Sequence, residues 1–181
     1  MKRSRSVVPL LFVVGAFLFP LTAGAQLMII GNDEKVGWNE AGAPVFAGPG
    51  KDSVLVVDIG TTPEMPKIVA SLPLMNSIFG PPTNLAITPD ERLAIVANSM
   101  TWVQDGGAWK PVPDNKLYVI DLKASPPKHI ATVEVGKQPS GLAINPRGDL
   151  ALVTNRADNS ISVLSIQHDE VKLVDTVPRE S

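Results

Sequence analysis

The apolar residues of this chain come in short runs separated by Pro, Gly, Asn and Asp. Residues 138–166, QPSGLAINPRGDLALVTNRADNSISVLSI, contain three such runs, at 141–145, 150–154 and 160–166. Pro fixes its own φ and has no N–H, and Gly and Asn tolerate positive φ, so these residues mark where strands stop. The β-branched residues between them suit a pleated, buried surface. The pattern predicts three strands joined by turns.

These runs belong to a repeated unit of four strands. Residues 82–99, PTNLAITPDERLAIVANS, match residues 139–156, PSGLAINPRGDLALVTNR, position by position. A third and a fourth apolar run follow each of these two segments, and an earlier unit has a third and a fourth run as well. The third runs are VLVVDI (54–59), LYVIDL (117–122) and ISVLSI (161–166), and the fourth runs are PKIVASL (66–72), PKHIATVEV (127–135) and VKLVDTV (171–177). Four short strands in a repeat of about 40–45 residues are typical of the blades of a β-propeller.

The third runs distinguish propeller blades from a β-sandwich, which is the competing interpretation. Leu117, Val119 and Ile120 cannot all face one side of a sheet, because successive side chains of a strand point in opposite directions. Such strands need a sheet stacked on each face, which blades around an axis supply. A sandwich covers one face of each sheet and shows cleaner alternation. No segment after residue 25 keeps a helical period, so we expect an all-β protein.

The repeats do not complete a ring. Residues 26–32, QLMIIGN, resemble a second strand, and no first strand precedes them. We therefore expect an incomplete propeller, an open arc of about three blades whose strands are antiparallel, four to a blade. The outer face of the last unit should be apolar through Leu142, Leu152 and Val163, with no further blade to cover it. The chain then either associates with itself through its open blade edges or is the front of a longer protein.

Residues 1–25 have the features of a secretory signal peptide. A basic start, KRSR, precedes the apolar run 7–22, and Ala-Gly-Ala then supplies the small residues that a signal peptidase accepts. A membrane anchor is the alternative, but the run is short for a span, and Pro and Gly interrupt it. We predict a periplasmic or secreted bacterial protein whose propeller domain is residues 26–181, with no membrane segment once the signal peptide is removed.

Composition narrows the chemistry. The 18 acidic residues exceed the 16 basic ones, and the lack of a basic run argues against nucleic acid and anionic lipid as partners. The absence of cysteine excludes thiolate catalysis, disulfides and cysteine-ligated metals. The chain must then gain its stability from core burial, which one domain of this length can provide.

The segment GKQPSGLAINPRGDLALVTNRADNSISVLSI (136–166) resembles the YVTN-type β-propeller repeat. VTN at 153–155 and VAN at 96–98 stand in the signature position. The resemblance covers roughly residues 26–177 and implies kinship with lactonase-like proteins and with the large subunits of periplasmic amine dehydrogenases. It is specific for the fold, because the repeat residues are structural. Such propellers usually close with about seven blades, whereas this chain encodes fewer than three complete ones.

Few residues could carry catalysis or hold a cofactor. The only histidines, His129 in a fourth strand and His168 in the turn after a third, should be peripheral and exposed. No HExxH, GxSxG or Gly-rich phosphate loop is present, and we assign no catalytic residue, no cofactor and no metal ligand. Asp105 with the two glycines after it could hold a calcium ion, but Asp-Gly is first of all a turn former.

The best candidate for a binding surface is the face that carries the two longest connections, 33–52 and 100–114. Both join a second strand to a third in successive units, so they should be neighbours on one face of the arc. Large aromatic residues on long loops often mark recognition surfaces, and the alternative is that they pack against the blades. The candidate partner-binding residues on this face are Trp38, Phe79, Trp102, Asp105 and Trp109.

Two functions of different kinds fit these observations. The first is a binding or scaffold module, not an enzyme, that binds another protein or a small ligand through the long-loop face. The second, implied by the resemblance, is part of a propeller enzyme, either a lactonase-like hydrolase or an amine dehydrogenase-type subunit. A lactonase would need acidic or histidine side chains clustered at the channel, where the first strands offer little beyond Asn84 and Asn145. The sequence therefore favours the binding module.

Overall fold

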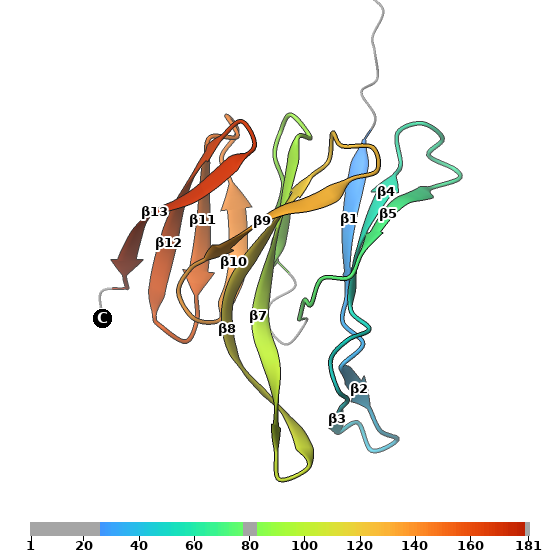
Figure 1. Cartoon of the computed structure of the whole chain (residues 1–181), viewed down its shortest axis with the longest axis vertical. Coiled ribbons are helices and arrows are strands. Elements are labelled where there is room, and N and C mark those ends of the chain that lie inside the picture. Colours follow the sequence, from blue (N-terminus) through green and yellow to red (C-terminus); the bar gives the residue numbers. More distant parts are fainter. Residues whose placement is uncertain (1–25, 78–82, 180–181) are drawn as a thin grey trace, which may run out of the picture.

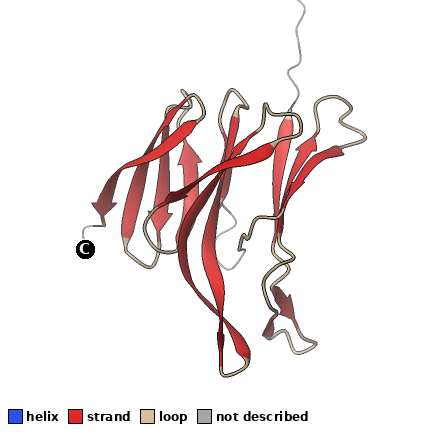
Figure 2. Ribbon diagram, viewed as in Figure 1, coloured by secondary structure: helices blue, strands red, loops and turns tan. Residues whose placement is uncertain are grey.

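The chain folds into antiparallel strands (Figure 1). The computed structural model describes residues 26–77 and 83–179, and every regular element within these two ranges is a strand (Figure 2). No membrane-spanning helix is found in the described part of the chain. The expected signal peptide lies outside the described residues.

Three of the four sheets correspond to the repeated units. The strands are β1 (Leu27–Asn32), β2 (Val36–Trp38), β3 (Pro44–Phe46), β4 (Ser53–Asp58), β5 (Lys67–Leu72), β6 (Leu85–Ile87), β7 (Leu93–Asp105), β8 (Ala108–Asp121), β9 (Lys128–Glu134), β10 (Pro139–Ile144), β11 (Leu150–Asn155), β12 (Ser160–Gln167) and β13 (Glu170–Pro178). The order β1-β4-β5 forms blade 1, β6-β7-β8-β9 forms blade 2, and β10-β11-β12-β13 forms blade 3. The fourth sheet is the hairpin of β2 and β3.

The three sheets are blades of a β-propeller, and they follow one another as an open arc (Figure 1). Within each blade, every strand pairs with its neighbour in the sheet in the antiparallel direction. Blade 1 begins with β1 in the place of a second strand, as the sequence predicts. The predicted fold class and the division into four-stranded units are therefore confirmed.

Each contact between blades has its own apolar core. The core between blades 1 and 2 contains Ile29, Val54, Val56, Ala94, Val96, Ile120 and Leu122. The core between blades 2 and 3 contains Leu93, Ile95, Ala97, Leu117, Val119, Leu142, Ala151, Val153, Leu164 and Ile166, together with Val135 and Val171. Successive residues of β7 and β8 thus alternate between two cores. This confirms that the strands of blade 2 are covered on both faces, which a sandwich would not require.

Blade 3 is covered on one face, and its other face exposes apolar side chains. Leu152 is 44% exposed, and Val163, its partner across the strand pair, is half-buried. The expectation that Leu142 lies on this outer face is wrong. Leu142 pairs with Val153 across β10 and β11, so both side chains point toward blade 2. Leu85 pairs with Val96 in the same way in blade 2, because the register of the hairpin decides which residues share a face.

The long connection 100–114 is not a loop inserted between two strands. β7 and β8 continue through it as one hairpin, which projects well beyond the blade (Figure 1). Its two-residue turn is Gly106-Gly107, and both glycines have positive φ (58° and 83°), which is what a type I′ hairpin turn demands. The connection 33–52 likewise contains the β2–β3 hairpin. We call the part of the β7–β8 hairpin formed by residues 100–113 the extension.

Candidate partner-binding face

The two hairpins project from the same end of the blades and contact each other, as the sequence predicts for neighbouring connections (Figure 1). Val36 of β2 packs against Met100 and Trp102 of the extension, and these three side chains form a third buried apolar cluster. Phe46 and Trp109 are partly buried against it. The cluster holds together segments that are more than sixty positions apart in the chain, so it fixes the orientation of the β2–β3 hairpin.

The structure separates the three tryptophans. Trp102 is 5% exposed, and Phe46 packs edge-on against it with the ring centroids 6.3 Å apart. Trp109 is partly buried, and its indole lies so close to Gly48 that a Cβ there would come within 2.9 Å of Nε1. Trp38, in contrast, is 62% exposed. Packing between the hairpins therefore explains the burial of Trp102 and, in part, that of Trp109. Among the tryptophans, Trp38 is the one that this face exposes to solvent.

Phe79 and Asp105 are the other two residues predicted to lie on this face. Phe79 lies outside the described residues. Asp105 precedes the turn of the extension, where its carboxylate is 2.5 Å from the ammonium of Lys110, and both side chains are exposed. No group of three or more His, Cys, Asp or Glu suited to a metal ion occurs among the residues that the structure describes.

A buried charged network ties the base of the β2–β3 hairpin to blade 1. The Lys35 side chain is fully buried, and its ammonium donates to the carboxylate of Asp52 and to the carbonyl of Asn76 at 2.8 Å. The Asp33 carboxylate lies 2.9 Å from the same nitrogen. Asp52 also accepts from the backbone N–H of Asn76 at 3.1 Å. The ammonium stands 4.8 Å from the ring centroid of Trp102, within the range of a cation–π contact.

This network was missed by the sequence reasoning, because lysine and aspartate are almost never fully buried unless they are paired. Its members come from three segments of the chain, and no spacing motif links them. Removing one partner of such a network leaves a buried charge without compensation, so the network is costly to break. Any arrangement that separates the hairpin from blade 1 would therefore leave buried charges unpaired.

A second polar contact supports the extension where it leaves blade 2. The side-chain amide of Asn98 donates to the carboxylate of Asp114 at 2.6 Å, and both residues are buried. The hydroxyl of Ser99 donates to the carbonyl of Pro139, which links the extension to blade 3. Two buried polar atoms have no partner among the described residues, the Asn98 carbonyl oxygen and the Trp102 indole nitrogen.

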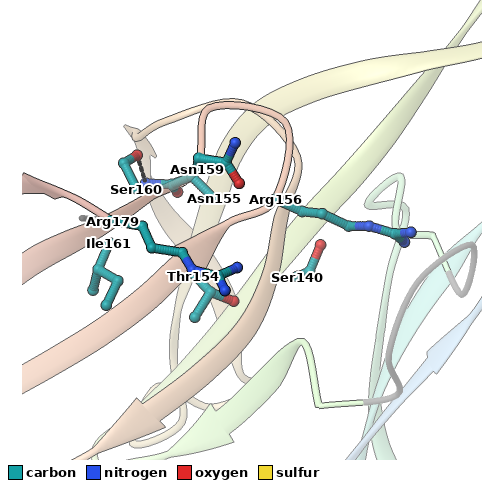
Figure 3. A pocket seen from close by; sticks show the side chains of 8 residues that line it. All are labelled: Ser140, Thr154, Asn155, Arg156, Asn159, Ser160, Ile161 and Arg179. Carbon is teal, nitrogen blue, oxygen red and sulfur yellow. Dashed lines mark hydrogen bonds between the residues drawn. The ribbon is translucent and has the colours of Figure 1, made fainter. Parts of the chain in front are cut away.

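A cavity of about 340 Å³ opens on blade 3 at the same end of the blades (Figure 3). It is lined by Ser140, Thr154, Asn155, Arg156, Asn159, Ser160, Ile161 and Arg179. Asn155 is buried, and its amide bonds to the hydroxyls of Ser160 and Ser162, both at 2.9 Å, so it closes the turn and is not available to a ligand. In the view of Figure 3, the guanidinium of Arg156 points away from that of Arg179. The cavity brings no acid and base together.

The opposite end of the blades carries ion pairs between turns. Arg92 of blade 2 bonds to Asp169 of blade 3 at 3.1 Å, and Arg147 bonds to Asp149 at 3.0 Å. The hydroxyl of Thr88, with the N–H and charge of Arg92, holds the pKa of Asp90 below its ordinary value. These contacts line a polar cavity of about 310 Å³ with His168 at its rim. The contacts satisfy one another, which favours a structural role.

Both histidines are exposed, as expected from the sequence. The ring of His129 stacks edge-on against Tyr118, with centroids 5.6 Å apart, and its Nε2 lies 2.8 Å from the carbonyl of Ala131. His168 has a positive φ of 55°, which its place in the tight turn between β12 and β13 requires. Burial, helped by the charges of Asp114 and Asp52, raises the pKa of Tyr118 to about 12.

Comparisons with known proteins bear on the fold. No protein-family model matches the chain, and no curated protein matches it. A candidate 6-phosphogluconolactonase from Bacteroides fragilis NCTC 9343 is similar in structure, with 12% identity, a TM-score of 0.49, and coverage of 80% of this chain and 38% of that one. Hydrazine synthase of Kuenenia stuttgartiensis gives 15% identity, a TM-score of 0.49, and 80% and 49% coverage.

The periplasmic gluconolactonase of Pseudomonas aeruginosa is a further similar structure, with 18% identity, a TM-score of 0.34, and coverage of 83% of this chain and 55% of that one. The chain thus spans between 38% and 55% of the length of these three proteins. The similarities concern the fold alone.

Proposed function

We propose that this chain is a binding module of an exported YVTN-type propeller protein and that it recognises a protein partner with the β2–β3 hairpin. The observation that carries the proposal is the contrast between a rigidly held base and an exposed tip. Trp38 is 62% exposed, and Pro44, its partner across the strand pair, is exposed beside it. Tryptophan is enriched among the residues that contribute most to protein interfaces.

The support beneath the tip favours a binding role. The Lys35 network and the cluster around Trp102 hold the base of the hairpin, so the backbone that carries Trp38 is held in place. A preorganised side chain loses little conformational freedom on binding, and this raises affinity without additional contacts. The exposed positions 37–45 around Trp38 are apolar or uncharged apart from Glu40, so the best match on a partner is an apolar pocket or groove.

Quantitative capture from a periplasmic extract of the source bacterium tests the proposal. The exported protein, Trp38→Ala and Met65→Ala are immobilised, and the captured proteins are compared by mass spectrometry. Met65 is the matched control, because it is 71% exposed but lies in the β4–β5 connection at the other end of blade 1. We expect Trp38→Ala to lower capture of a specific partner at least tenfold, with Met65→Ala unchanged. Equal capture by all three proteins would overturn the proposal.

Two further measurements address export and the enzyme alternative. The intact mass of the periplasmic form should correspond to a chain that begins at Gln26, and retention of residues 1–25 in a membrane fraction would contradict the signal peptide. The resemblance to lactonase-like propellers makes hydrolysis of a gluconolactone the first reaction to assay. Turnover would assign an enzymatic role to the chain, and the capture experiment would still decide the binding role of Trp38.

A further inference from the structure

The two edges of the extension differ in their capacity to form hydrogen bonds. In the register of the hairpin, Met100 pairs with Pro113 and Trp102 with Pro111. Antiparallel pairs alternate between those that exchange two N–H···O bonds and those that exchange none. Proline has no N–H, so these two pairs must be of the second kind. The backbone groups of all four residues therefore point away from the partner strand, toward the free edges of the hairpin.

The β8 edge of the extension is blocked and the β7 edge is not. On the β8 side, two of the three outward-pointing positions, Pro111 and Pro113, lack an N–H, which is a device by which proteins protect an exposed edge. On the β7 side, Met100, Trp102 and Gln104 each keep an N–H and a C=O. β6 pairs with β7 opposite residues 94–96, and Asn84 just before it still bonds to Ala97. From residue 100 onward, no strand of the described residues pairs with the β7 edge.

A separate observation also marks Trp102. Its indole N–H is buried and has no acceptor within the described ranges 26–77 and 83–179. A buried donor without an acceptor is costly, and most such donors in native proteins are paired. The indole itself lies inside the cluster of Val36, Met100 and Phe46, where a strand added at the edge would not reach it. The free backbone edge is therefore the observation that indicates a strand added from outside.

We propose that this edge pairs with the same edge of a second copy of the chain, antiparallel and with a two-fold axis at Trp102. In this register Met100 faces Gln104 of the other copy, and the donors of each edge meet the acceptors of the other. The pairing would form about six hydrogen bonds over a length of about 17 Å. No like charges are brought together, because Asp105 is already paired with Lys110 at the tip.

The proline-protected edge argues for a second copy, because a two-fold axis uses one edge from each chain and leaves the other edges outside. The extension also projects beyond the blades, so the blades do not separate two such edges (Figure 1). Contacts made by identical surfaces around a two-fold axis are the commonest basis of protein dimers. The inference does not depend on the proposed function, since the edge and Trp38 belong to different hairpins.

Sedimentation velocity of the exported protein at tens of micromolar, with a matched pair of variants, tests the proposal. Gln104→Pro removes an outward-pointing N–H and should preserve the hairpin, as Pro111 and Pro113 do in the native chain. Gln104→Thr keeps the N–H and suits a strand. We expect a dimer for the native protein and for Gln104→Thr, and at least a tenfold weaker one for Gln104→Pro. A native protein that sediments as a monomer would overturn the proposal.

Leu152→Lys separates this contact from association through the open face of blade 3. A dimer formed through the β7 edge should persist in Leu152→Lys. If Leu152→Lys abolishes the dimer and Gln104→Pro does not, pairing through the β7 edge is refuted. Register is tested by mixing the single variants Thr101→Cys and Val103→Cys in a chain that has no native cysteine. The proposed axis places residue 101 opposite residue 103 of the other copy, at a separation a disulfide can bridge. Failure of the mixture to form that disulfide would contradict the register even if Gln104→Pro misfolds.

Discussion

The first two strands of blade 2 and of blade 3 have similar sequences, and the two blades differ in how much of these strands is buried. β7 begins with LAIVAN, and β11 is LALVTN. All six residues of the first segment are buried, whereas burial alternates along the second, with Leu150 and Leu152 exposed. Blade 2 packs against a neighbouring blade on both of its faces, whereas blade 3 packs against a blade on one face only. The stability gained from a side chain in this fold therefore depends on the neighbouring sheet as much as on the strand that carries it.

The second difference between these blades is the extension. In blade 3 a short turn joins the second strand to the third, whereas in blade 2 the same strands continue into a projecting hairpin. A hairpin outside the blade interface needs its own support, because an isolated two-stranded ribbon is marginally stable at best. The cluster around Trp102 and the charges around Lys35 supply this support. The comparison separates stability that comes from stacking blades from stability that is built locally.

The largest effect should come from the local charges. Lys35→Ala leaves the carboxylates of Asp33 and Asp52 buried without the ammonium, and we expect a loss of about 3–5 kcal/mol in the free energy of unfolding. Lys172→Ala in blade 3 is the control. It removes an ion pair with Glu170 in which both side chains are more than half exposed, so the loss should stay below about 1 kcal/mol. Urea unfolding measures both, and equal losses would show that the Lys35 network contributes little.

The next effect tests the cluster beneath the extension. Trp102→Ala should lower the free energy of unfolding by about 3 kcal/mol, since it empties the space between Val36, Met100 and Phe46. Trp38→Ala should change it by less than about 0.5 kcal/mol, because that side chain is mostly in solvent. Thermal unfolding of the two variants is the measurement. A large loss for Trp38→Ala would mean that Trp38 stabilises the fold and is not held ready for a partner.

Equivalent positions of the repeat give a direct comparison of the two blades. Ile95 and Leu152 occupy the same place in β7 and β11, and both point toward the side of the next blade. Ile95→Ala should cost about 2–3 kcal/mol because the residue is fully buried between blades 2 and 3. Leu152→Ala should cost less than about 1 kcal/mol in the monomer. Similar losses at both positions in urea unfolding would show that the outer face of blade 3 is covered in solution.

The smallest effect is a dependence on pH at the turns. The amide of Asn145 and the guanidinium of Arg147 hold the pKa of Asp149 below its ordinary value, and Thr88 does the same for Asp90. A carboxylate whose pKa is lower in the folded protein stabilises it above about pH 4, the ordinary aspartate value. That stability is lost as the pH falls through the lower, folded pKa. Asp149→Asn should therefore lower the melting temperature slightly at pH 6 and not at pH 2–3, and a larger deficit at low pH would reverse the sign.

The strands, their grouping in fours and the incomplete first unit can all be predicted from the sequence. These features are local. Apolar runs set the strands, Pro, Gly and Asn end them, and a unit that recurs with the same signals must adopt the same structure. The sequence also placed the two long connections on one face, because that follows from the up-and-down order of the strands. It could not show that the second connection continues β7 and β8, since residues 100–114 mix strand formers with three glycine or proline interruptions that resemble a loop.

Which side chains are buried depends on how the blades and hairpins pack together. Trp38 and Trp102 occur in similar polar surroundings in the sequence, and the contact between two hairpins makes one exposed and the other buried. Lys35 is an ordinary charged residue in the sequence, and its partner Asn76 lies 41 positions away. Leu142 lies on the inner face because the register of β10 and β11 places it opposite Val153. For Trp102 and Lys35 the deciding interactions join segments far apart in the chain, and their energy depends on positions that exist only once the blades have stacked.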